Sequence, residues 1–315
     1  MSSNNTTQTS SQTETSLVVA YYPFTLIIVG TLLNLFTFFI LYRSSFRDTK
    51  KQPVIHYMRT IAIFDILMLY GWNFDHYLQI VHGYILLTYS IPTCKIFGFL
   101  NYFAAQSSAW LRVAISFERY LSVSRLHRTI FNRQKGVLIT IASIITITLL
   151  LNLHFIIFTC FVRPNGRISP NAPSYIIYPL WDYVNLGLYN CAPFIFMMIF
   201  NSYTIYHLVH RRRERLIHQS AIHHQAISFT LILTTFLFLL MTIPATIVAA
   251  FFYTVPTTTL AKILDSALYT YHILSFPLYF LTFSAFRREV IHMVTCDKNR
   301  QRIAPSGTTG TGPAH

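Results

Sequence analysis

The sequence contains few charged residues for its length. Charged side chains make up 11% of the 315 residues, whereas a water-soluble domain carries about 25%. This is too little charge to cover a surface that faces water. Hydrophobic residues make up 53% of the chain, which is too apolar for a basic DNA-binding protein or for a chain that is mostly disordered. The composition indicates a membrane protein and predicts no nucleic-acid partner.

Cysteine, repeats and catalytic motifs are scarce as well. Four cysteines in the chain exclude a small disulfide-stabilised scaffold, and the lack of an internal repeat disfavours a transporter with duplicated halves. No His-Glu-x-x-His motif or other catalytic cluster is present. Asp65 and Asp75 lie ten residues apart, about 15 Å along a helix. We therefore expect no enzymatic activity and no cofactor or metal.

Seven apolar stretches are long enough to cross a lipid bilayer, which takes about 20 helical residues. They predict an all-α membrane protein, a bundle of seven transmembrane helices within residues 17–294. The polar residues 1–16 form an outer tail and residues 295–315 a disordered inner tail. The predicted spans are 17–42, 54–80, 96–118, 136–160, 182–209, 226–253 and 261–284.

The basic residues predict the orientation of these spans. Of the 24 Lys and Arg residues, 19 fall on one side of a seven-span arrangement, in 43–59, 119–135, 211–215 and after 286. Short cytoplasmic loops collect Lys and Arg. We therefore expect a multi-pass protein of the plasma membrane with an extracellular N-terminus.

The first 16 residues agree with this orientation. No basic segment precedes the first apolar stretch, so a cleaved signal peptide is not expected. Asn4 and Asn5 each begin an Asn-x-Thr sequon, which suits a glycosylated extracellular tail.

The third predicted span has two features at a fixed spacing. Cys94 lies at its outer start, and Glu118-Arg119-Tyr120 lies at its inner end. The 25 residues from Cys94 to Arg119 correspond to about 37 Å of helix, a full crossing. This arrangement resembles the rhodopsin-like (class A) family of G-protein-coupled receptors, in which an acidic-Arg-Tyr triplet ends the third span.

Further residues match the resemblance, which runs from about residue 25 to 296. Asn34 and Asp65 match the family's buried polar pair, and Phe286-Arg287 begins where the family has a short amphipathic eighth helix. A single membrane proline is often a tolerated kink, but three occur at matching places. The prolines that match the family's helix bends are Pro193, Pro244 and Pro277.

The resemblance implies roles for the cysteines and for the inner end. Cys94 and Cys160 would form a disulfide to the second outer loop, in an oxidising compartment. Cys296 would be palmitoylated, whereas Cys191 is expected to be a buried free thiol. Glu118, Arg119 and Tyr120 would couple to a heterotrimeric G protein.

Several of the family's switch residues are replaced. Thr242 stands where the sixth span usually has Trp, and Asn201 where the fifth has Tyr. The usual Asn-Pro-x-x-Tyr reads Phe276-Pro277-Leu278-Tyr279-Phe280, and His224 replaces an acidic residue that can restrain Arg119. An activation relay through the family's tyrosines is therefore not expected.

Arg112 stands where the family usually has an aliphatic residue. It follows Ser108 by four residues on one helical face, and Ser108 aligns near Asp65. Our hypothesis is an internal Asp65–Arg112 pair that replaces the sodium ion bound by many relatives. The alternative is an Arg that extends to the inner membrane interface.

The residues in the outer half of the predicted bundle indicate the class of ligand. Thr270 replaces the lysine of opsins, and Asn101 replaces the aspartate of amine receptors. Three carboxylates near the mouth suit a basic peptide, as in the invertebrate neuropeptide-type orphan receptors that the chain resembles. The alternatives are a chemosensory receptor for small molecules or a transporter that uses Asp65 and Arg112. The predicted ligand-binding residues are Asp75, His76, Asn101, Tyr102, Gln106, Asp182, Thr246, Asp265 and Tyr269.

Overall fold

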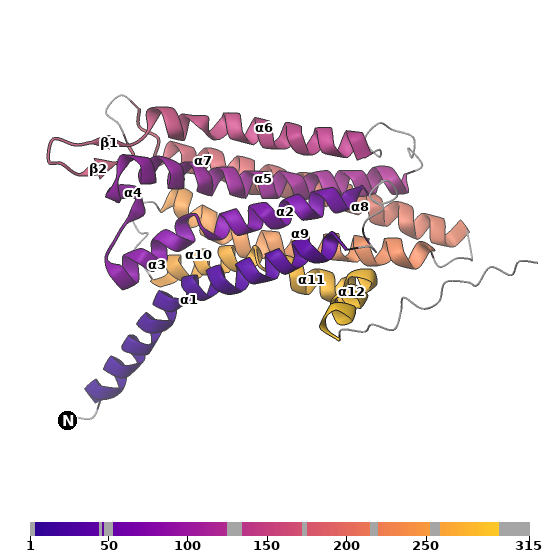
Figure 1. Cartoon of the computed structure of the whole chain (residues 1–315), viewed down its shortest axis with the longest axis horizontal. Helices are drawn as coiled ribbons and strands as arrows, with labels where there is room; N and C mark the ends of the chain where they lie inside the picture. The colour runs from indigo at the N-terminus through magenta and orange to yellow at the C-terminus, as the bar shows by residue number, and fades with distance from the viewer. Residues whose placement is uncertain are drawn as a thin grey trace, which may run out of the picture.

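The long helices lie side by side along one axis (Figure 1). The structure is a computed structural model that describes residues 4–43, 46, 53–124, 134–171, 175–214, 220–252 and 259–295. In order, the helices are α1 (Asn4–Leu41), α2 (Val54–Leu69), α3 (Trp72–His82), α4 (Leu86–Tyr89), α5 (Ile91–Val123), α6 (Gln134–Phe158), α7 (Leu180–Asn185), the π-helical turn η3 (Leu186–Cys191), α8 (Ala192–Glu214), α9 (Ser220–Phe251), α10 (Thr259–Tyr271), α11 (Ser275–Thr282) and α12 (Ser284–Val294).

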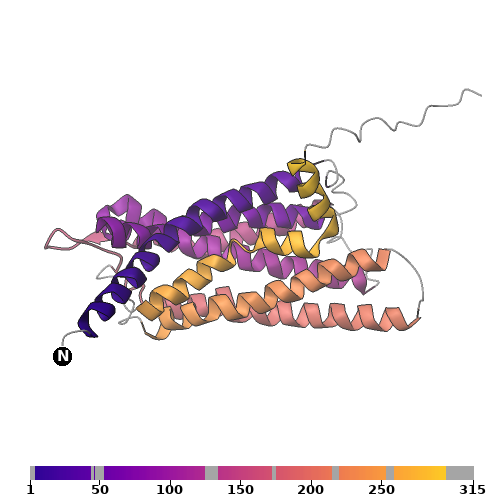
Figure 2. The same cartoon turned by 90° about the horizontal axis from the view of Figure 1, so that it is seen from below.

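A short hairpin marks one end of the bundle, the predicted outer end, and the last helix marks the other, the predicted inner end. The antiparallel strands β1 (Phe161–Val162) and β2 (Ile168–Ser169) lie at one end (Figure 1). The start of α1 extends from that same end, whereas α12 lies at the other end (Figure 2). The two termini of the described chain are therefore at opposite ends of the bundle, as an odd number of crossings requires.

Five of the predicted spans are long and apolar enough, among the described residues, to cross a membrane. They are Tyr21–Leu41, Val54–His82, Gln134–Phe158, Leu180–His210 and Ile232–Phe251. The third span, α5, is more polar because it faces protein, and the seventh span is divided into α10 and α11, which have 13 and 8 residues. α5 packs against α2, α6 and α8, and buried polar residues on it lower its hydropathy. The lipid would cover the outside of the bundle. α6 is apolar all round, and only 28% of the residues in its most apolar stretch are buried within the bundle.

Three of the spans are interrupted, two of them next to prolines. The ring of Pro277 excludes the helical hydrogen bond to Ile273, and the seventh span breaks between Tyr271 and Ser275. The π-helical turn η3 lies directly before Pro193 in the fifth span. The second span breaks at Gly71, where a Cβ would lie 3.0 Å from Asn101 Oδ1. By contrast, α9 continues through Pro244.

The short eighth helix is amphipathic as expected. Phe286 and Val290 of α12 are buried, whereas Arg287 and Arg288 are exposed. Arg43, just after α1, forms an ion pair of 3.3 Å with Glu289. The predicted seven-helix bundle with a short eighth helix is confirmed.

Candidate functional site

Asp65 on α2 is at the centre of a buried polar cluster and is fully shielded from solvent. Its Oδ1 accepts hydrogen bonds from Ser108 Oγ at 2.7 Å and from His272 Nδ1 at 2.8 Å. Its Oδ2 accepts from Arg112 Nη2 at 2.7 Å and from Ser275 Oγ at 3.1 Å. Each carboxylate oxygen therefore has two donors, which come from α5 and from the seventh span.

Local structure brings these donors together. Ser108 and Arg112 are four residues apart on α5 and so share one helical face. His272 is the first residue of the break between α10 and α11, and Ser275 is the first residue after it; the break directs both side chains to Asp65. A continuous helix would leave no free backbone carbonyl at this level. Here the carbonyl of His272 accepts a hydrogen bond of 3.0 Å from Asn34 Nδ2.

The fifth span also reaches this cluster. Tyr189, in the π-helical turn η3, lies with its hydroxyl 3.2 Å from His272 Nε2. A carboxylate only accepts hydrogen bonds, so His272 Nδ1 carries the proton that it donates to Asp65. In neutral His272, Nε2 then accepts from the Tyr189 hydroxyl. Arg112 balances the charge of Asp65.

The hypothesis of an internal Asp65–Arg112 pair agrees with this geometry, and the alternative does not. Arg112 is 8% exposed, and its Nη1 donates to the carbonyl and to the hydroxyl of Ser108, one turn closer to the outer end of α5. The guanidinium thus points away from the inner interface. Asn34 and Asp65 do not contact each other directly in the described residues, because His272 lies between them.

A cavity of about 30 Å³ lies on the inner side of Arg112, between α5, α8, α9 and α11. The guanidinium carbon is 5.0 Å from the ring centre of Tyr271, which also lines the cavity. The buried Tyr271 hydroxyl has no hydrogen-bond partner among the residues that the structure describes. A cavity of this size and polarity has room for ordered water.

Most of the predicted ligand-binding residues join helices to one another. Tyr102 donates a hydrogen bond of 2.7 Å to Asp182. Gln106 donates to Asn185 at 3.0 Å and accepts from Asn152 at 2.7 Å. These contacts connect α5 to the fifth span and to α6.

Two more of the predicted ligand-binding residues also join segments of the bundle. Asp75 accepts a hydrogen bond from the backbone N–H of Leu86 at the start of α4. Asn190 donates to Thr246 at 2.7 Å, which joins η3 to α9. Asn101 differs from these residues: it is buried beside Gly71, and its Oδ1 has no hydrogen-bond partner among the residues that the structure describes.

His76 and Asp265 differ from this group because they are accessible. His76 Nε2 lies 3.8 Å from Asp265 Oδ2, and their side chains are 25% and 32% exposed. The ring of Tyr269 is perpendicular to that of His76, with 6.4 Å between ring centres. Among the three predicted ligand carboxylates, that of Asp265 is the most exposed.

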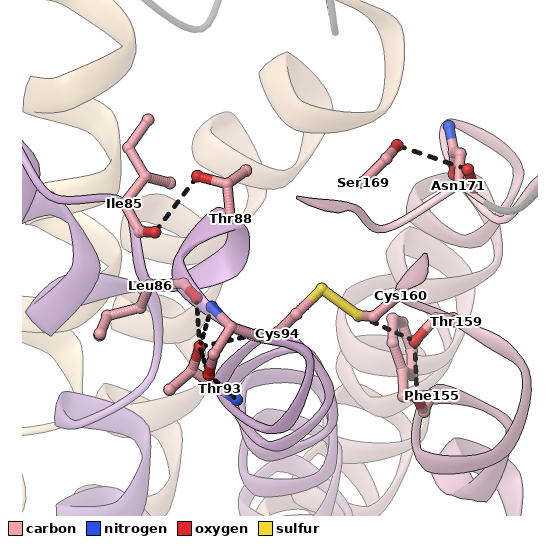
Figure 3. The surroundings of a disulfide bond; sticks show 11 residues. Ile85, Leu86, Thr88, Thr93, Cys94, Phe155, Thr159, Cys160, Ser169 and Asn171 are labelled. Atoms are coloured by element: carbon pink, nitrogen blue, oxygen red, sulfur yellow. Dashed lines mark hydrogen bonds between the residues drawn. A yellow bond between two sulfur atoms is a disulfide. The ribbon is translucent and has the colours of Figure 1, made fainter. Parts of the chain in front are cut away.

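The predicted disulfide between Cys94 and Cys160 is confirmed (Figure 3). It joins the first turn of α5 to the segment after α6. Ser90 and Thr93 form a capping box at the start of α5, and Thr93 Oγ1 also donates to the carbonyl of Leu86 (Figure 3). The expectation for Cys191 is wrong in one respect. The thiol is free but exposed on the outside of the fifth span.

At the inner end of α5, Arg119 Nε lies 3.7 Å from Glu118 Oε2, and both residues are buried. Tyr120 packs on α8, with 6.1 Å between its ring centre and that of Phe200. Asn201, in the place of the family's tyrosine, donates a hydrogen bond of 2.9 Å to Thr235 on α9.

A second contact holds the inner end of α9. Thr230 donates to Thr282 of α11 at 2.5 Å. The predicted roles of the His224 side chain and of Cys296 lie outside the described residues, as do the side chains of Asn4 and Asn5.

The family model described as 7 transmembrane receptor (rhodopsin family) matches residues 33–278, well over half of the chain. The chain belongs to this family. It is therefore a multi-pass membrane receptor and not an enzyme, and its family implies a ligand and a G protein as partners. No curated protein matches the chain.

Three residues of the buried cluster were not predicted from the sequence. His272 and Ser275 bind Asp65, and Tyr189 binds His272. One indication was present in the sequence, because His272 interrupts an otherwise apolar span and polar residues within a membrane usually have a partner. Nothing in the sequence indicated that the break and the π-helical turn would direct these side chains to one point.

Proposed function

We propose that the receptor binds an extracellular peptide with a basic group and activates a heterotrimeric G protein through the inner end of α5. The observation that carries the ligand class is the accessible His76–Asp265 pair at the outer end of α3 and α10. The distance of 3.8 Å between Nε2 and Oδ2 exceeds that of a hydrogen bond. A guanidinium or ammonium group can therefore bind Asp265 without displacing a strong internal contact.

The other two predicted ligand carboxylates are buried and already accept internal hydrogen bonds, which leaves Asp265 as the group for a basic ligand. Asp182 is 5% exposed and accepts from Tyr102, and Asp75 is 6% exposed and accepts from Leu86. A ligand that reached either would leave a buried donor without its partner, which costs about 1–3 kcal/mol. Asp265 is the carboxylate from which a basic ligand gains most.

Coupling to the G protein is a shift between two populations of the bundle. Ligand at the outer end favours a state in which the inner half of α9 moves away from α8 and α11, about Pro244. That movement breaks the Asn201–Thr235 and Thr230–Thr282 contacts. It uncovers Arg119, which binds the G protein in the proposed active state.

The test is a peptide-library screen in cells that express a promiscuous G protein. We expect a basic peptide to elicit a response that Arg119→Ala abolishes at equal surface expression. Asp265→Asn should weaken the potency of that peptide roughly 10- to 100-fold, because a charge-assisted hydrogen bond is lost. Ser266→Ala, the next residue on α10, is the matched control and should leave potency unchanged.

Two outcomes would contradict the proposal. An agonist without a basic group whose potency Asp265→Asn leaves intact would indicate the chemosensory alternative. A response that persists in Arg119→Ala would exclude coupling through this arginine.

A further inference from the structure

We propose that Arg112 is a built-in counter-ion that occupies the place of a monovalent cation beside Asp65, so that sodium does not stabilise this receptor. The inference is independent of the ligand and of the G protein. It rests on how completely the structure satisfies the Asp65 carboxylate.

The carboxylate has no position left for a cation. A carboxylate has about four lone-pair sites, and Asp65 accepts four side-chain hydrogen bonds, two on each oxygen. A sodium ion would have to displace a donor from a fully buried site. It would also lie next to a guanidinium of the same charge, in a medium where that repulsion is weakly screened.

Arg112 is fixed in this place by more than its charge. Its Nη1 donates to the carbonyl and to the hydroxyl of Ser108, and its Nη2 donates to Asp65. On its inner side the guanidinium faces the ring of Tyr271, a cation–π contact of 5.0 Å. The planar group is therefore held on three sides, and a thermal rotation of the side chain would not free Asp65.

Removal of the guanidinium would leave a set of oxygen ligands suited to a hard cation. Asp65 Oδ2, Ser108 Oγ and Ser275 Oγ come from three helices and already meet at Asp65. Hard monovalent and divalent cations prefer carboxylate, hydroxyl and water oxygens. The cavity next to Arg112 has room for the water that would complete the coordination shell. Arg112→Met should therefore create a sodium site where the wild type has none.

The experiment measures thermal unfolding of the purified full-length receptor in sodium chloride and in N-methyl-D-glucamine chloride at equal ionic strength. We expect the wild type to have the same Tm in both salts. Arg112→Met should unfold at a lower temperature in N-methyl-D-glucamine and should regain about 2–4 °C in sodium. Arg112→Met combined with Asp65→Asn should show no sodium effect, because the carboxylate is gone.

Arg112→Lys is the matched control, since it keeps the positive charge and should remain insensitive to sodium. A wild-type Tm that rises in sodium would overturn the inference, as would an Arg112→Met receptor that sodium does not stabilise. If Arg112→Met does not fold, the wild type and Arg112→Lys still decide, because sodium stabilisation of either one contradicts a built-in counter-ion.

Discussion

Asp65 and Arg112 are each buried at a depth where a single charge would be costly. The pair offsets this cost only because each group also has neutral partners, and these are Ser108, His272 and Ser275. Removal of one member of a buried pair typically costs about 3–5 kcal/mol. The buried cluster therefore contributes to stability only as a unit.

Asp65→Asn should lower the thermal stability and the surface expression of the receptor. It removes the counter-ion of Arg112 and places an N–H group opposite donors, so that a loss of about 3–5 kcal/mol is expected. Asp65→Asn combined with Arg112→Met should recover much of the loss, because no isolated charge remains. Thermal unfolding and flow cytometry of surface receptor measure both effects. A double variant no more stable than Asp65→Asn would contradict the pairing.

Part of this cluster could be predicted from single residues. Asp65 and Arg112 were expected to meet because an isolated charge in a membrane needs a partner, because Ser108 and Arg112 share a helical face, and because the family resemblance places Ser108 near Asp65. His272 and Ser275 could not be assigned in the same way. Their direction depends on three residues of irregular backbone between α10 and α11, and the sequence specifies the proline but not the path of the chain before it.

The helices that move in the proposed activation are held by short polar contacts. Asn201 and Thr235 join α8 to α9, and Thr230 and Thr282 join α9 to α11. Residues Asn201 and Thr242 mark where the family's tyrosine and tryptophan are missing. The sequence showed these absences, but it could not show that Asn201 would form a contact of its own with the sixth span, because that depends on the register between two helices.

Asn201→Leu should raise basal signalling. The substitution keeps the number and branching of the side-chain heavy atoms and removes the hydrogen bond to Thr235, which is worth about 0.5–1.5 kcal/mol, so that the active population rises roughly 2- to 12-fold. Ligand-independent nucleotide exchange on a co-expressed G protein measures the change. Ser202→Ala, at an exposed position next to Asn201, is the matched control. Unchanged basal exchange in Asn201→Leu would show that this contact does not restrain α9.

The arrangement of the whole molecule followed from composition more directly than its details did. Apolar runs predicted seven crossings, and the described chain has its termini at opposite ends of the bundle (Figure 2). The structure of the outer loops could not be predicted in the same way. The hairpin of β1 and β2 and the use of Asp75 and Asp182 as internal hydrogen-bond acceptors depend on contacts between segments far apart in sequence.

The orientation in the membrane can be tested on intact cells. An N-terminal epitope tag should bind antibody without permeabilisation, and a C-terminal tag should bind only after it, because the basic loops favour the cytoplasmic side. Treatment with an N-glycosidase should lower the apparent mass of the wild type but not of Asn4→Gln combined with Asn5→Gln. Detection of both tags before permeabilisation would contradict the predicted topology.

The division of the seventh span into α10 and α11 has a consequence for how the receptor can be modulated. Asp265 belongs to the first piece, whereas Ser275 and the contact to α12 belong to the second. We expect an outer ligand to act on the first piece, while the second piece keeps its contact with α12. A compound that binds outside and one that binds inside could therefore occupy the same receptor together, each addressing one half of a single crossing.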